Sequence, residues 1–73
     1  MMGTKNNPGK FDCYEKAEPD EPMFVLLARD PDAYWAVGKW IEKKRARGGE
    51  SEEKLAEAQA TMLAMVDWQK GNR

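Results

Sequence analysis

Apolar residues recur at helical spacing through the second half of the chain. Over residues 31–47, and again over residues 51–70, they return every three or four positions, which is the pattern of an amphipathic helix. The first apolar face consists of Ala33, Val37, Trp40 and Ile41, and the second of Leu55, Ala58, Met62, Met65 and Val66. The pattern predicts two helices that pack against each other through these faces.

Residues at the ends of both segments are those that begin and end helices. Asp30 followed by Pro31 is typical of an N-cap and a first helical residue, and Ser51 followed by two glutamates repeats the signal. The pair Gly48–Gly49 ends the first segment, and Gly71 is expected to end the second at about residue 70. Two long helices joined by so short a glycine turn form an antiparallel hairpin.

The first part of the chain has no such period. Residues 1–9 are polar and contain Gly and Pro, which predicts a disordered leader ahead of one small domain over residues 10–73. Residues 10–17 are either a short strand or one helical turn, because so few positions do not distinguish the two. Residues 23–29 (MFVLLAR) are a continuous apolar run. Its phenylalanine and valine favour a buried strand and its leucines and alanine a helix; we expect the strand.

These segments predict a mainly α fold, or an α+β fold if residues 10–29 hold a two-stranded ribbon. Such a ribbon is marginal unless helices or a partner chain support it. A chain of 73 residues buries only about 60% of the surface exposed in its unfolded form. With one cysteine and no histidine, neither a disulfide within the chain nor a zinc site is expected to brace it. We therefore expect a homo-oligomer.

Charges are nearly balanced in number but not in position. The chain has 12 basic and 13 acidic residues, which does not favour a nucleic-acid binder by bulk charge. Residues 10–32 are mainly acidic and residues 33–49 mainly basic, and such blocks attract each other within a chain or between subunits. The basic run KKRAR, residues 43–47, has a simple interpretation as a complement to the helix dipole. Brought together by oligomerisation, several such runs would instead form a pocket for a small phosphorylated ligand, whereas a DNA duplex would meet the acidic segments.

Two of the three tryptophans lie off the predicted apolar faces. Trp35 falls almost opposite the first face, and Trp68 falls well off the second. Either the N-terminal segment covers one of them, or they lie in a subunit interface, or they stack on a nucleotide base. The candidate interface residues are Trp35 and Trp68, and the candidate ligand-binding residues are Tyr14, Arg29, Trp35, Lys39, Lys43, Arg45 and Arg47.

No catalytic constellation is present in the sequence. There is no histidine, no serine elbow, no glycine-rich phosphate loop and no set of metal ligands, so we expect neither an enzyme nor a cofactor. Ser51 is interpreted as a helix cap, and Cys13, which lacks a base partner, as a buried thiol. The longest apolar run is too short to cross a bilayer, and the polar start has no apolar signal region. We expect a cytoplasmic protein with no membrane partner.

The stretch from Lys10 to about Trp40 resembles a family of short, uncharacterised bacteriophage and prophage proteins. The resemblance is carried by DEPMFVLLARDP, residues 20–31, followed by an aromatic helix that contains Trp40, and it covers somewhat under half the chain. It names no activity, so no functional residue carries over from it.

What the resemblance implies is a phage setting, with the host cytoplasm as the place of action. Small non-catalytic phage proteins often counter host defence, and in general character the chain is similar to sponge proteins that sequester a nucleotide-type immune signal in a homo-oligomeric pocket. Two other roles stay open. One is a protein–protein inhibitor of a host defence complex, similar to an anti-CRISPR protein, and the other is a minor virion or morphogenesis protein.

Overall fold

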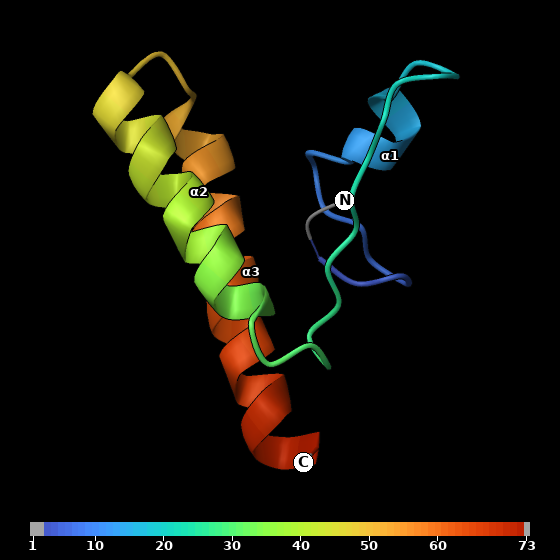
Figure 1. Cartoon of the computed structure of the whole chain (residues 1–73), viewed down its shortest axis with the longest axis vertical. Coiled ribbons are helices and arrows are strands. Elements are labelled where there is room, and N and C mark those ends of the chain that lie inside the picture. Colours follow the sequence, from blue (N-terminus) through green and yellow to red (C-terminus); the bar gives the residue numbers. More distant parts are fainter. Residues whose placement is uncertain (1–2, 73) are drawn as a thin grey trace.

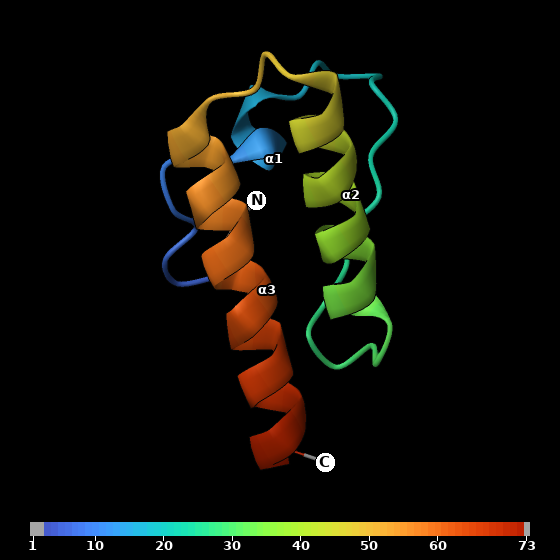
Figure 2. The same ribbon diagram turned by 90° about the vertical axis from the view of Figure 1, so that its left-hand side faces the viewer.

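Two long helices form an antiparallel hairpin in the computed structural model of the chain, which describes residues 3–72. Helix α2 spans Ala33–Arg47 and helix α3 spans Glu52–Asn72, and the two lie side by side (Figure 1). A four-residue helix, α1 (Cys13–Lys16), lies in the N-terminal arm, which we define as residues 10–29. The arm runs behind the hairpin when both long helices face the viewer (Figure 2). The predicted mainly α fold is confirmed, and residues 3–72 contain no strand.

The start of α2 follows from the Asp-Pro signal. The side-chain Oδ1 of Asp30 accepts a hydrogen bond from the backbone N–H of Asp32 at 2.9 Å, in a turn that precedes the helix; the N-cap residue itself is Asp32, whose side chain makes no cap hydrogen bond. The N–H of Ala33 bonds to the carbonyl of Asp30 at 3.0 Å and closes a tight turn. Regular α-helix therefore begins at Ala33, two residues after the predicted start.

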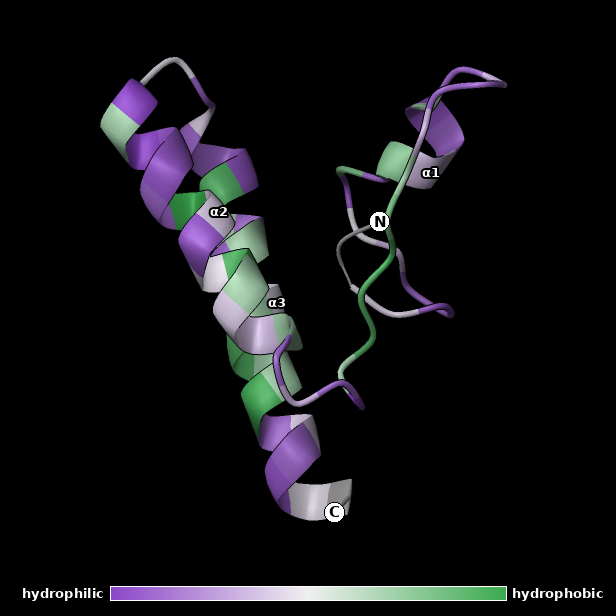
Figure 3. Ribbon diagram, in the orientation of Figure 1, coloured by the Kyte–Doolittle hydropathy of each residue, from purple (hydrophilic) through white to green (hydrophobic). Residues whose placement is uncertain are grey.

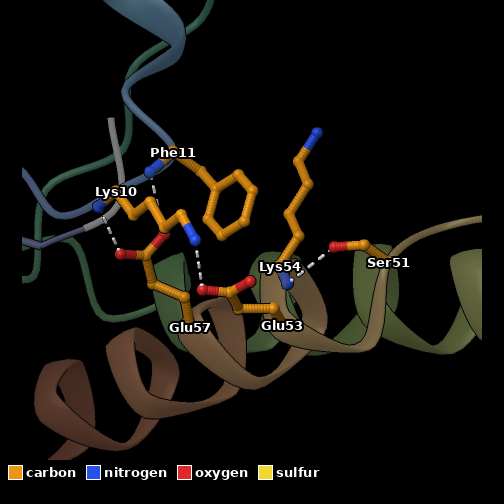
Figure 4. A network of polar contacts seen from close by, with 6 residues as sticks. All are labelled: Lys10, Phe11, Ser51, Glu53, Lys54 and Glu57. Carbon is orange, nitrogen blue, oxygen red and sulfur yellow. Dashed lines mark hydrogen bonds and ion pairs between the residues drawn. The ribbon is translucent and has the colours of Figure 1, made fainter.

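The hairpin turn has the predicted caps. Gly48 has a φ of 77°, which favours glycine, and its N–H bonds to the carbonyl of Lys44 at 2.9 Å. Ser51 accepts the N–H of Lys54 on its Oγ at 3.0 Å and so begins α3 (Figure 4). At the other end α3 continues through Gly71 to Asn72, about two residues beyond the expected end.

The core of the hairpin is small and apolar. Its fully buried side chains are Ala33 and Ile41 from α2 and Leu55 and Ala58 from α3, all members of the two predicted faces. Close approach is allowed by Gly38, where an added Cβ would lie 3.1 Å from the sulfur of Met62. The prediction that the two apolar faces meet is confirmed: Val37, Met62, Met65 and Val66 are half-buried around this centre, and Trp40 is exposed at its edge.

The arm is attached to α3 by polar contacts. The carboxylate of Glu57 accepts the backbone N–H groups of Lys10 at 2.8 Å and Phe11 at 3.1 Å, while the Lys10 Nζ donates to Glu53 at 2.7 Å (Figure 4). At the far end of the arm, the side-chain amide of Gln69 donates to the carbonyl of Ala28 at 2.7 Å. These bonds hold the arm to one side of the hairpin at its two ends.

The segment predicted as a buried strand is neither a strand nor buried. The chain runs without regular structure through residues 21–27 and then turns, with the N–H of Asp30 bonded to the carbonyl of Leu27 at 3.0 Å. Among residues 3–72 no second segment pairs with its backbone, and a strand needs a neighbour. The apolar stretch is visible in the arm, well separated from the ribbon of α2 (Figure 3).

The two remaining expectations concern the beginning of the chain. Residues 13–16 take the helical alternative, with the Oδ1 of Asp12 accepting the N–H of Tyr14 at 3.1 Å. In the expected leader, Thr4 and Asn7 exchange two backbone hydrogen bonds in a turn. Residues 1 and 2 of that leader lie outside the described part of the chain.

Candidate functional site

A shallow groove lies on α2, mainly on the side of the helix opposite its contact with α3, and extends to Trp40, which lies near Lys54 of α3. Its volume is about 500 Å³, and its walls are formed by Trp35, Ala36, Lys39, Trp40, Lys43, Lys44 and Arg47, a set that we call the cationic groove. Ile41 and Gly38, which pack toward α3, lie on the other side of the same helix. The groove is thus the outer surface of one helix, and no residue of the arm lines it.

Four of these residues form one row. Trp35, Lys39, Lys43 and Arg47 follow each other at intervals of four positions, which places neighbouring Cβ atoms about 5–6 Å apart on a helix. The row is about 18 Å long, because each residue advances the helix by about 1.5 Å. An exposed indole therefore stands at one end of a line of three cations.

Two cations of the groove make no ion pair in the described part of the chain. Lys39 Nζ lies 3.4 Å from Glu42, in a pair exposed enough for solvent to screen it, and Lys44 Nζ lies 3.9 Å from Glu50. Neither Lys43 nor Arg47 has an ion pair within residues 3–72. The groove is accordingly a local positive surface on a chain of net charge −1.

The two tryptophans of the groove differ in their surroundings. Trp40 has the Nζ atoms of Lys44 and Lys54 at 5.6 Å and 5.9 Å from its ring centroid, and Glu50 lies within 4 Å of both ammonium groups. This cluster connects Trp40, in the middle of α2, to Glu50 in the turn and to Lys54 in the first turn of α3. Trp35, by contrast, is 64% exposed and has no such ring contact among the described residues. Its flat face is open to a ligand.

The structure brings together four of the predicted ligand-binding residues: Trp35, Lys39, Lys43 and Arg47. It adds Trp40, which sequence analysis placed on the first apolar face, and Lys44 of the KKRAR run, four residues further along the same helix. Their position at the edge of that face was the available signal, because an edge residue borders the outer surface as well.

Three predicted residues lie outside the groove. Tyr14 belongs to α1 in the arm, and Arg29 lies in the turn before α2. The guanidinium of Arg45 donates to Oε1 of Gln59 on α3 at 3.3 Å and so faces the neighbouring helix. Within a single chain these three residues do not line the groove, because each is on an element or a helix face directed elsewhere; their part in a binding site stays a prediction.

The indole rings of Trp35 and Trp68, which lie off the predicted apolar faces, are both exposed, as expected for a hairpin of two helices alone. Trp35 is 64% exposed and Trp68 is 52% exposed. The alternative in which the N-terminal segment covers one of them is therefore wrong. The arm instead crosses to α3 through Glu57 and Gln69 and leaves both indoles more than half accessible.

A second hollow of about 390 Å³ lies against the arm. Phe11, Cys13, Met23 and Phe24 form much of its wall, together with Lys54 from α3. Cys13 is exposed here, so the expectation of a buried thiol is wrong; the short α1 contributes no residue to the core. The hollow lacks the row of cations that distinguishes the groove on α2.

The titratable groups of the described residues provide no set of metal ligands and one clear pKa shift. No cluster of three or more His, Cys, Asp or Glu side chains is placed to hold a metal ion among residues 3–72. The carboxylate of Glu53, through its hydrogen bond and its charge, raises the pKa of Lys10 above 10.5, but this pair lies at the arm. None of the helices in residues 3–72 is long and apolar enough to span a membrane.

Comparisons with protein-family models, with curated proteins and with solved structures give no match to this chain.

Proposed function

We propose that the protein is a non-catalytic binding protein that sequesters a nucleotide-type anion in the cationic groove. The observation that carries this proposal is the row in which the exposed ring of Trp35 stands in line with Lys39, Lys43 and Arg47. A nucleotide combines an aromatic base with phosphates. The groove offers a surface for stacking and donors for the phosphates on one continuous face.

The base and the phosphates of a nucleotide would each contribute to the free energy of binding in this groove. Stacking of a base on an aromatic side chain contributes about 1–3 kcal/mol. Lys43 and Arg47, free of ion pairs in the described chain, are available for charge-assisted hydrogen bonds to phosphate oxygens. On one chain the groove is shallow and open, so the proposal includes a homo-oligomer in which copies of the groove together enclose the ligand.

The biological setting of the proposal comes from the resemblance of residues 10–40 to short phage and prophage proteins. In that setting the ligand is a signalling nucleotide of the host, and stoichiometric capture in the host cytoplasm removes it from a defence system. The exposed Trp35 also supports a second candidate function, in which its patch docks on a host defence protein and blocks it.

Thermal melting in the presence of ligands tests the first function. The panel consists of AMP, ATP, a cyclic dinucleotide and ADP-ribose, with inorganic phosphate for comparison. A nucleotide present at about 100 times its Kd would add about 2.7 kcal/mol to the stability of the folded protein and raise the melting temperature by about 10–20 °C. A panel in which no nucleotide changes the melting temperature contradicts sequestration. Capture of a host protein through Trp35 by the same preparation would favour the second function.

Matched variants locate the binding site. Trp35→Ala is expected to weaken nucleotide binding roughly tenfold or more, because it removes the stacking surface. Arg47→Ala is expected to weaken it about tenfold. Arg45→Ala is the control: both arginines lie near the end of α2, but Arg45 faces Gln59 on α3. Equal losses from Arg45→Ala and Arg47→Ala would show that binding depends on charge alone and not on the groove.

A further inference from the structure

The arm leaves its apolar stretch without a partner. Met23, Val25 and Leu27 are 51%, 62% and 52% exposed, and Phe24 is 85% exposed. No backbone hydrogen bond joins residues 23–26 to any other part of residues 3–72. Extended chain with unpaired N–H and C=O groups and β-favouring side chains is a template for pairing with another strand.

The odd-numbered residues of the segment form an apolar strip. In an extended segment successive side chains point to opposite sides, so Met23, Val25 and Leu27 share one side, and all three are exposed. On the other side Phe24 is 85% exposed, and only Leu26 and Ala28 are half-buried. The carbonyl of Ala28 accepts a hydrogen bond from Gln69 of α3. The segment thus rests against the molecule only at its end, and the strip of Met23, Val25 and Leu27 faces solvent.

The charges beside the strip complement each other across a two-fold axis. If two copies pair in antiparallel fashion with Val25 opposite Val25, then Met23 lies opposite Leu27, and Glu21 lies beside Arg29 of the other copy. Neither Glu21 nor Arg29 makes an ion pair within residues 3–72. If the pairing is centred on Phe24 or Leu26 instead, a charged side chain lies opposite an apolar one.

Turns limit the length of this pairing. A backbone bond from Glu21 to Glu18 closes one turn, and the bond from Asp30 to Leu27 closes the other. The turns carry Asp20 and Asp30 away from the ladder, where their like charges would otherwise meet. Arg29 lies within the second turn, but its side chain is long enough to reach a carboxylate beside the paired segment.

We propose that residues 23–27 of two copies form an antiparallel β-pair centred on Val25, with Glu21 of each copy bound to Arg29 of the other. The partner of the unpaired backbone edge is therefore a second copy of this chain, and the apolar strips of the two copies lie next to each other on one face of the pair. The interface is isologous, so one surface serves both copies. It is small, and the dimer is expected to dissociate on dilution. This inference does not depend on nucleotide binding at α2.

Light scattering and sedimentation over a concentration series test the pairing. The wild-type mass is expected to rise from 8.3 kDa toward twice that value. Glu21→Arg and Arg29→Glu are each expected to lower the dimer fraction several-fold, and the two changes together are expected to restore it. Glu18→Arg, a charge reversal outside the strip, is the control. A wild-type protein that stays monomeric up to about 1 mM, or a double variant that is no better than the single ones, overturns the proposal.

Cross-linking tests the register independently of affinity. In a Cys13→Ser background, Val25→Cys places two thiols opposite each other, within the Cα separation that a disulfide requires. Met23→Cys in the same background places them about 14 Å apart along the pair. The Val25→Cys protein is expected to form a disulfide dimer at least several-fold faster under mild oxidation. Equal rates for the two variants, with helix content unchanged by circular dichroism, contradict the register.

Discussion

The helical hairpin and the N-terminal arm are held by different kinds of interaction. Between α2 and α3, the contact is apolar, with Ile41, Leu55 and Ala58 buried and Gly38 allowing close approach. The arm instead depends on a few hydrogen bonds at its two ends and leaves most of its apolar residues exposed. Apolar burial scales with area and cooperates across the core, whereas a few polar contacts near solvent contribute little each. The hairpin is thus expected to be the stable unit, and the arm the part that is released first.

This difference also separates the two proposed activities. The cationic groove lies on the hairpin, where a packed helix holds Trp35, Lys43 and Arg47 in a fixed row. The self-pairing segment lies in the arm, where the backbone has no internal partner. A ligand site benefits from a rigid support, and a strand that pairs with a second copy benefits from an unpaired edge.

The largest expected effect comes from a core change in the hairpin. Leu55→Ala removes a side chain that is 2% exposed and is expected to lower the free energy of unfolding by about 2–4 kcal/mol, through lost burial and the cavity left behind. Denaturant unfolding followed by circular dichroism measures it. The control is Leu63→Ala, at a residue 55% exposed on the same helix, where a change within about 0.5 kcal/mol is expected. Equal losses of stability from Leu55→Ala and Leu63→Ala would contradict the placement of Leu55 in the hairpin core.

A smaller effect is expected when the arm is released. Glu57→Gln replaces the carboxylate that accepts the N–H groups of Lys10 and Phe11, and bonds to a charged acceptor are stronger than those to an amide. Faster amide hydrogen exchange at Phe11 is expected, with a loss of about 1 kcal/mol in local stability. Exchange within α2 should stay unchanged. Glu52→Gln, which alters a glutamate of α3 that does not contact the arm, serves as the control. Equal acceleration throughout α2 would mean that arm and hairpin unfold together.

The cap of α3 provides a comparable test on the hairpin side. Ser51→Ala removes the oxygen that accepts the N–H of Lys54 and is expected to cost about 1 kcal/mol of global stability. Ser51→Asp keeps an acceptor at the same position and is expected to recover most of the loss. Thermal unfolding of both variants measures the difference. If neither variant differs from wild type, the cap does not contribute as the geometry indicates.

The smallest expected effect is a pH dependence at the arm. Because Glu53 raises the pKa of Lys10 above 10.5, the folded state binds the Lys10 proton more tightly than the unfolded state does. The pair therefore stabilises the protein below the unfolded pKa, and this contribution disappears as pH rises through the folded pKa. The melting temperature of Lys10→Met should lie slightly below that of wild type near pH 9, and the two should converge near pH 12. A constant difference over that range would exclude the ion pair as its cause.

The helical hairpin follows from local signals in the amino-acid sequence. Periodic apolar positions, the Asp-Pro start, the Gly48–Gly49 turn and the Ser51 cap each specify local geometry, and all agree on two helices. The sequence also located the row from Trp35 to Arg47, because spacing of four residues on one helix places side chains in line whatever the rest of the chain does.

The neighbours of the N-terminal arm and of the candidate binding residues depend on the tertiary fold. Residues 23–29 had the composition of a strand, but strand formation requires a neighbour, and no described part of the chain provides one. Tyr14, Arg29 and Arg45 had suitable chemistry for the groove, and yet the path of the arm and the position of α3 direct them elsewhere. Local signals act over a few residues, whereas these outcomes depend on contacts between segments far apart in the chain.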